Sequence, residues 1–81
     1  MQINKILKTI RINKNLRQED IAKEIGIQSN TYSDWERGRT QKIAFEDIEK
    51  IANICDYEII FKNKLDNTIL SSKNIDRKGV E

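Results

Sequence analysis

The chain of 81 residues is 37% apolar and 35% charged, which is the composition of one small soluble domain without room for a second core. It has no histidine and a single cysteine, so the usual zinc ligand sets, an internal disulfide and a Ser/His/Asp or Cys/His catalytic constellation are absent. No apolar run is long enough to span a membrane, and no glycine-rich phosphate loop is visible. We therefore expect a cytoplasmic protein that is not an enzyme and needs no cofactor or metal.

The net charge of +2 indicates little about partners, but the charges are unevenly distributed. Residues 1–16 carry four basic residues and no acidic one, and residues 37–44 carry three basic residues and no acidic one. Residues 17–36 and 45–61 are each net negative. Two basic clusters thus flank an acidic helical region, and such clusters are either solvated faces or a surface for a polyanion.

Apolar residues at helical spacing predict a first helix over about residues 2–13. A polar break at 13–15 is followed by a second helix, which Gly26 ends because a residue without a side chain suits the left-handed turn there. A third, short helix is expected from about Ser29 to Arg37, with Gly38 as its end.

The stretch AFEDIEKIANIC, residues 44–55, keeps one apolar face and predicts a fourth helix, after which Asp56 can take the left-handed capping position. The following YEIIFK favours a short β-strand with Tyr57, Ile59 and Phe61 on one face.

A single strand needs a partner for its edge hydrogen bonds. We expect the same strand of a second copy, paired antiparallel about a two-fold axis. Pairing with the TIL segment, residues 68–70, of the same chain remains open. The region from 63 to 81 is mostly polar, and its last ten or so residues are expected to be disordered.

Residues 17–37 have the features of two helices joined by a tight turn. Ala22 lies where the two helices cross closely, and Gly26 lies in the turn four residues later. Tyr32 and Trp35 are expected to face inward. A small residue, a glycine and apolar positions at these offsets are the requirements of a helix-turn-helix.

The stretch LRQEDIAKEIGIQSNTYSDWERGR resembles the Cro/phage-repressor, or xenobiotic response element (XRE), family of helix-turn-helix proteins. The resemblance covers roughly residues 3–62, and its most specific element is the WE-x-G at Trp35. It implies an all-α, lambda-repressor-like DNA-binding fold of four to five helices with a short C-terminal strand. The DNA-binding domain would span residues 1–62 with its motif at 17–37, and residues 63–81 would form a partly disordered polar tail.

The resemblance also assigns structural roles. It implies an ion pair between Glu36 and Arg11 that orients the motif, because breaking one side would leave an uncompensated charge. Trp35 seals the inner face of the third helix, and Ala22 and Gly26 allow the close helix crossing and the turn.

Base reading needs hydrogen-bonding side chains on the outer face of the third helix. The candidates are Gln28, Ser29, Asn30, Ser33 and Asp34. Asn30 could form a bidentate pair with adenine, and Asp34 either accepts a hydrogen bond from cytosine or lowers affinity by repelling phosphates. Gln28 stands where a capping serine is common, so Ser29 is an alternative cap. The plain alternative is that these are ordinary polar residues of a helix start.

Phosphate contacts give affinity and register without sequence information. The candidates are Arg17, Gln18, Tyr32, Arg37, Arg39 and Lys42. Arg17 and Gln18 begin the second helix, where backbone N–H groups also favour a phosphate. Tyr32 replaces a small aliphatic residue of the family, and its hydroxyl must find water, a partner or a phosphate.

These features favour a homodimeric regulator of transcription that binds double-stranded DNA, a repressor if its operator overlaps a promoter. Its third helices would enter successive major grooves at half-sites of an inverted repeat about 34 Å apart. One alternative is an antitoxin that regulates its own operon and binds a toxin protein. Another is a protein-interaction module that keeps the fold but does not bind DNA.

Overall fold

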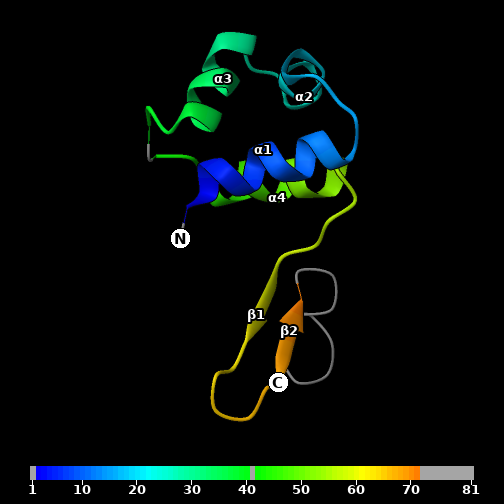
Figure 1. The fold of residues 1–81 in the computed structure, drawn as a ribbon, viewed down its shortest axis with the longest axis vertical. Helices are drawn as coiled ribbons and strands as arrows, with labels where there is room; N and C mark the ends of the chain where they lie inside the picture. The colour runs from blue at the N-terminus through cyan, green and yellow to red at the C-terminus, as the bar shows by residue number, and fades with distance from the viewer. Residues whose placement is uncertain (1, 41, 72–81) are drawn as a thin grey trace.

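The computed structural model describes residues 2–40 and 42–71, in which four helices precede a β-hairpin (Figure 1). The helices are α1 (Ile3–Asn13), α2 (Gln18–Ile25), α3 (Ser29–Arg37) and α4 (Phe45–Ile54), and the strands are β1 (Ile60–Lys62) and β2 (Ile69–Ser71). The mainly helical fold predicted from the sequence is therefore confirmed.

Left-handed residues end three of the four helices. Gly26 ends α2 with φ of +81°, and its amide donates to the Ala22 carbonyl oxygen at 2.9 Å. Gly38 ends α3 with φ of +76°, and a Cβ placed there would lie 3.3 Å from Nδ2 of Asn4. Asp56 follows α4 with φ of +65°, as expected from the sequence. The α2–α3 turn is thus short because glycine adopts this conformation without steric cost.

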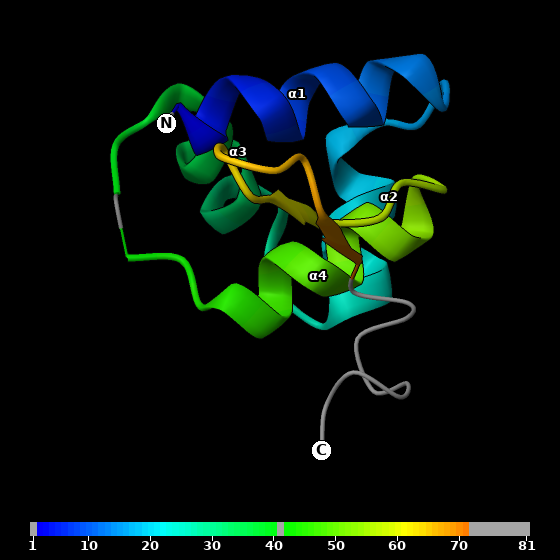
Figure 2. The same cartoon turned by 90° about the horizontal axis from the view of Figure 1, so that it is seen from below.

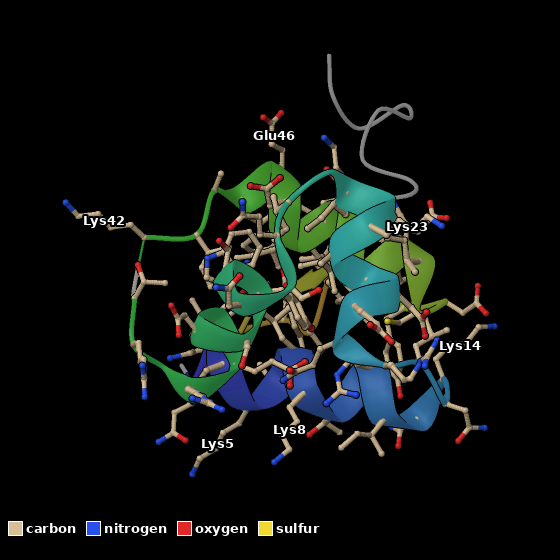
Figure 3. All side chains as sticks on the ribbon, turned by 90° about the horizontal axis from the view of Figure 1, so that it is seen from above. Lys5, Lys8, Lys14, Lys23, Lys42 and Glu46 are labelled. Carbon is tan, nitrogen blue, oxygen red and sulfur yellow. The ribbon has the colours of Figure 1, made fainter. Side chains whose placement is uncertain are left out.

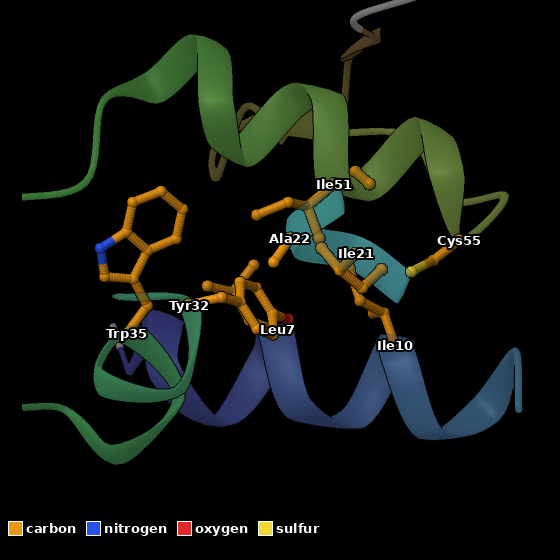
Figure 4. Packing of buried hydrophobic residues seen from close by; sticks show 9 residues of the cluster. Leu7, Ile10, Ile21, Ala22, Tyr32, Trp35, Ile51 and Cys55 are labelled. Carbon is orange, nitrogen blue, oxygen red and sulfur yellow. The ribbon is translucent and has the colours of Figure 1, made fainter. Parts of the chain in front are cut away.

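The core lies where α1 and α4 contact each other and receive α3 and α2 (Figure 4). Tyr32 and Trp35 project inward from α3 with ring centroids 6.0 Å apart in an edge-to-face arrangement. Ala22 is 1% exposed at the crossing of α2 with its neighbours. The buried apolar residues are Leu7, Ile10, Ile21, Ala22, Tyr32, Trp35, Ile51, Ala52 and Cys55.

The strand pairing differs from the expectation for Tyr57, Ile59 and Phe61. Of these three residues only Phe61 lies in β1, and β1 pairs antiparallel with β2 of the same chain, with Phe61 opposite Leu70. The structure therefore contains the intrachain pairing that the sequence left open. Ile59 packs against the helical core, and the Tyr57 hydroxyl accepts a hydrogen bond from Nδ2 of Asn13 at 2.9 Å.

The turn between the strands explains the intrachain pairing. The Asn63 amide donates to the Thr68 carbonyl oxygen at 2.8 Å, and the Asn67 amide donates to the Asn63 carbonyl oxygen at 2.9 Å. Oδ1 of Asn63 also accepts from the Leu65 amide at 2.8 Å, and Asn67 adopts φ of +65°. Asn and Asp side chains satisfy turn amides locally and tolerate the left-handed region, so this polar segment folds back on itself.

The hairpin extends from the side of α1 and α4 that is opposite to α2 and α3 (Figure 1). Seen from below, it projects between α1 and α4 (Figure 2). It continues past the expected domain boundary at residue 62, because β2 ends at Ser71. The disorder expected at the end of the chain concerns residues 72–81, which lie outside the described residues. No helix within 2–40 and 42–71 is long and apolar enough to cross a membrane.

Candidate nucleic-acid interface

A buried carboxylate joins the three elements that carry the candidate site. Glu36 lies on the inner face of α3 and is 7% exposed. Arg11 of α1 donates from Nε to Oε2 at 2.7 Å and from Nη2 to Oε1 at 3.0 Å, and Nε2 of Gln18 donates to Oε1 at 3.0 Å. Nη1 of Arg11 donates to the Leu16 carbonyl oxygen at 2.8 Å, just before α2. We call these four residues the Glu36 hub.

The hub fixes the relative positions of α1, α2 and α3 because its charges are both buried and paired. Burial alone would raise the pKa of Glu36, but hydrogen bonds from Arg11 and Gln18 hold this pKa below its usual range. The hydrogen bond to Glu36 likewise raises the pKa of Arg11. The ion pair implied by the resemblance is thus present, and the hydrogen bond that Gln18 contributes to it was not anticipated.

The position of Tyr32 in the structure contradicts the phosphate contact predicted for it. The sequence predicts both an inward position and a phosphate contact for this residue, and the two cannot hold together. The side chain is 0% exposed, so the predicted phosphate contact is wrong. Its hydroxyl forms no well-aligned hydrogen bond within the described residues, although the Glu36 carboxylate lies near it. Burial, with this neighbouring carboxylate, raises the pKa of Tyr32.

The candidate base-reading residues form the outer edge of α3. Gln28, Ser29 and Asn30 are exposed at the start of the helix, whereas Ser33 and Asp34 are half-buried in its second turn. Gln28 occupies the N-cap position without a capping hydrogen bond from its side chain. Ser29 is therefore the first helical residue, and the alternative cap expected at this position is not found.

One basic cluster lies at the start of α2. Arg17 is exposed at the N-cap of this helix, and its guanidinium lies 3.0 Å from Glu19 and 3.6 Å from Asp20. The Asp20 carboxylate accepts the Arg17 backbone N–H at 2.8 Å, which lowers the pKa of Asp20. Such exposed ion pairs are weak and exchange readily for a stronger anion.

A shallow groove at this point brings both kinds of candidate residue together. It has a volume of about 450 Å³, and it is lined by Arg11, Arg17, Gln18, Glu19 and Ser29. The start of α2 and the start of α3 are thus neighbours, which the sequence spacing alone does not establish.

The second basic cluster follows α3. Arg37 and Arg39 are exposed, and Lys42 projects away from the loop that leads to α4 (Figure 3). Nη1 of Arg39 lies 3.8 Å from Oδ1 of Asp34. Asp34 therefore faces the basic cluster as well as the outer edge of α3, a contact that was not anticipated.

Comparison with known proteins points to the same segment of the chain. A helix-turn-helix family model matches residues 7–61, a range that contains α2, α3 and every residue of the Glu36 hub. The chain is also 30% identical over 84 residues to the cryptic phage CTXphi transcriptional repressor RstR of Vibrio cholerae. That alignment covers 93% of this chain and 75% of the relative. No solved structure matches the chain.

Proposed function

Because the chain belongs to the XRE-type helix-turn-helix family of DNA-binding transcriptional regulators, we propose that it is a repressor that binds an inverted-repeat operator as a dimer. Each copy inserts the start of α3 into a major groove, and the two half-sites lie about 34 Å apart. The similarity to a phage transcriptional repressor supports the direction of regulation.

The observation that carries this proposal is the exposed polar start of α3 on a rigidly held helix. Gln28, Ser29 and Asn30 are exposed, while Glu36 in the last turn of the same helix is anchored to α1 and α2. Asn30 offers the amide donor and acceptor that a bidentate pair with adenine requires. Because the hub holds the helix against α1 and α2, the backbone that carries Asn30 is held in a fixed position.

The two basic clusters supply the phosphate contacts on either side of this edge. Arg17 exchanges its contacts with Glu19 and Asp20 for a phosphate, which the backbone N–H groups at the start of α2 also attract. Gln18 gives one amide hydrogen to Glu36 and keeps a second for the same phosphate. Arg37, Arg39 and Lys42 hold the backbone beyond the other end of α3.

Asp34 reduces the affinity for DNA sequences other than the operator. Its carboxylate lies near Arg39 and offsets part of that charge, and it repels any phosphate that approaches α3. A cytosine amino group presented to Asp34 replaces this repulsion with a hydrogen bond. The residue therefore lowers affinity for random DNA more than affinity for the operator.

The proposal is tested by selecting duplexes from a random pool with the purified full chain, then measuring the affinity for the selected duplex across a salt series. We expect enrichment of an inverted repeat and an affinity that falls steeply as salt rises, because phosphate contacts release counterions. The substitution Asn53→Ala, at an exposed position of α4, serves as a control and is expected to leave the selected sequence unchanged. A pool without an enriched sequence would contradict the proposal.

A further inference from the structure

The first half of α1 carries two lysines that the proposed function does not use. Of the four basic residues at the start of the chain, Arg11 belongs to the Glu36 hub, and Lys14 forms an ion pair with an aspartate after α4. The other two, Lys5 and Lys8, are exposed. Neither forms an ion pair within the part of the chain that the structure describes. We call these two residues the α1 lysine pair.

The spacing along α1 places Lys8 on the face of this helix that contacts α3. Asn4, Lys8 and Arg11 are four and three residues apart, so they lie on one face of the helix. Nδ2 of Asn4 donates to the Glu36 carbonyl oxygen at 3.5 Å, and Nε of Arg11 donates to the Glu36 carboxylate at 2.7 Å. Lys8 is between these two residues along α1, so it lies beside the last turn of α3.

Lys5 extends the lysine pair towards the loop after α3. Both lysines project from the same side of α1 (Figure 3). Lys5 follows Asn4, whose Nδ2 would lie 3.3 Å from a Cβ placed on Gly38. The start of α1 and the end of α3 are therefore in close contact. Because the second basic cluster begins on either side of Gly38, it is a neighbour of the lysine pair.

The other end of the lysine pair approaches the basic cluster at the start of α2. Arg11 follows Lys8 by about one helical turn, and it lines the shallow groove together with Arg17 and Gln18. The pair thus lies between the two basic clusters. α1 contains no acidic residue, and the Glu36 carboxylate that it contacts is already paired with Arg11 and Gln18. The lysine pair and the two clusters therefore form one basic band.

The lysine pair differs from the arginines on either side of it in its acidic neighbours. The Arg17 guanidinium lies 3.0 Å from the Glu19 carboxylate, and the Arg39 guanidinium lies 3.8 Å from the Asp34 carboxylate. Each of these arginines exchanges a carboxylate for a phosphate when DNA binds, which reduces the net gain in free energy. The lysines give up no ion pair within the described part of the chain, so the counterion release of each phosphate contact adds to the affinity in full.

We propose that the α1 lysine pair binds phosphates of the same duplex whose bases α3 reads. The pair connects the phosphate contacts at the start of α2 with those after α3, so one stretch of the duplex backbone lies along α1. The contact gives affinity without sequence preference, because a phosphate carries the same charge at every base pair. This inference rests on the proposed function in that it adds a third element of the chain to the same DNA contact.

The test is fluorescence anisotropy of the full chain with two labelled duplexes of about 30 base pairs, the selected one and one of random sequence. Lys5→Gln/Lys8→Gln removes both charges and keeps polar side chains. On both duplexes it is expected to reduce the slope of log affinity against log salt by about 2. Between about 50 and 200 mM salt, the wild type should therefore lose about tenfold more affinity than this variant.

A matched control separates the position of the lysines from the net charge of the chain. Lys23→Gln/Lys50→Gln removes the same charge at exposed positions of α2 and α4. Lys23 projects from a different side of the molecule than Lys5 and Lys8 (Figure 3). This control is expected to keep the wild-type slope. Circular dichroism checks that both double variants keep their helices.

A second measurement identifies the phosphates that the lysine pair contacts. Each duplex in a series carries one neutral methylphosphonate in place of one phosphate. At a phosphate held by the pair, this replacement is expected to weaken binding of the wild type and to leave binding of Lys5→Gln/Lys8→Gln unchanged. At phosphates held by the arginines, it should weaken binding of both proteins.

A double variant that keeps the wild-type slope would overturn the inference, and so would a control that loses the same slope. A series without any phosphate at which the two proteins differ would also overturn it. Its failure differs from that of the proposed function. An enriched inverted repeat with an unchanged slope in the variant contradicts only the phosphate contact of α1. A slope reduced on the random duplex, without an enriched sequence, contradicts only the proposed base reading.

Discussion

The two ends of the molecule leave opposite kinds of group at the surface. At the α2–α3 end the buried carboxylate of Glu36 is fully paired, and the exposed residues Gln28, Ser29 and Asn30 are polar. At the hairpin end the polar groups of the turn are satisfied locally, and Phe61 and Leu70 are exposed. The comparison shows which partner each end suits. One end can exchange hydrogen bonds with a polar ligand, and the other offers apolar area whose burial would be favourable.

The largest effect is expected from removing the centre of the Glu36 hub. Glu36→Ala leaves the Arg11 guanidinium largely buried without its counter-charge, which should lower the free energy of unfolding by about 3–5 kcal/mol. Asp34→Ala is the matched control on the same helix, because its contact with Arg39 is exposed and should cost less than about 1 kcal/mol. Urea unfolding followed by circular dichroism measures both. Equal losses for the two variants would contradict the structural role of the hub.

Acid should weaken the α2–α3 end through the same carboxylate. The pKa of Glu36 is lowered in the folded chain, so the stability it contributes is present above its unfolded pKa and is lost as pH falls through its folded pKa. Unfolding curves of the wild type should therefore lose stability below about pH 4.3. Glu36→Gln should be less stable at pH 7 and lack this part of the acid dependence. A pH profile that is identical in both proteins would disprove the assignment.

The phosphate clusters should affect affinity without affecting sequence preference. Arg37→Ala is expected to weaken binding to operator and random DNA alike, and to reduce the slope of log affinity against log salt by about 1. Lys64→Ala on the hairpin turn is the control, and its slope should match that of the wild type. Fluorescence anisotropy at several salt concentrations measures the slopes. A change confined to the selected duplex would instead assign Arg37 to base reading.

The smallest effect is expected at Tyr32, next to the hub. Its buried hydroxyl lacks a well-aligned hydrogen bond within the described residues, so Tyr32→Phe relieves a desolvated polar group and keeps the ring. The free energy of unfolding should stay unchanged or rise by up to about 1 kcal/mol. A decrease in the free energy of unfolding by more than about 1 kcal/mol would show that the hydroxyl stabilises Glu36.

The helices were predictable because each has an apolar face at helical spacing, and because Gly26, Gly38 and Asp56 mark where three of them end. The Arg11–Glu36 pair was predictable only through the family resemblance. The hydrogen bond from Gln18 depends on how α2 lies against α3, which spacing along the chain does not determine.

The sequence left the hairpin only as an alternative to pairing with a second copy, because β2 is short and follows a polar stretch. The turn formed by Asn63, Asn67 and their neighbours brings residues 69–71 alongside β1, where they pair with it. Tyr32 was misassigned to phosphate because a tyrosine fits either a core or a wet surface, and only the packing around it selects one.

The central claim is that Asn30 reads bases while the basic clusters only position the helix. It is tested most directly by the ratio of affinities for the selected duplex and for a scrambled duplex of equal length, measured for the wild type and for Asn30→Ala at one salt concentration. We predict that Asn30→Ala weakens binding to the selected duplex by about 1–3 kcal/mol and leaves binding to the scrambled duplex unchanged. An equal effect on both duplexes, or none on either, would contradict the account.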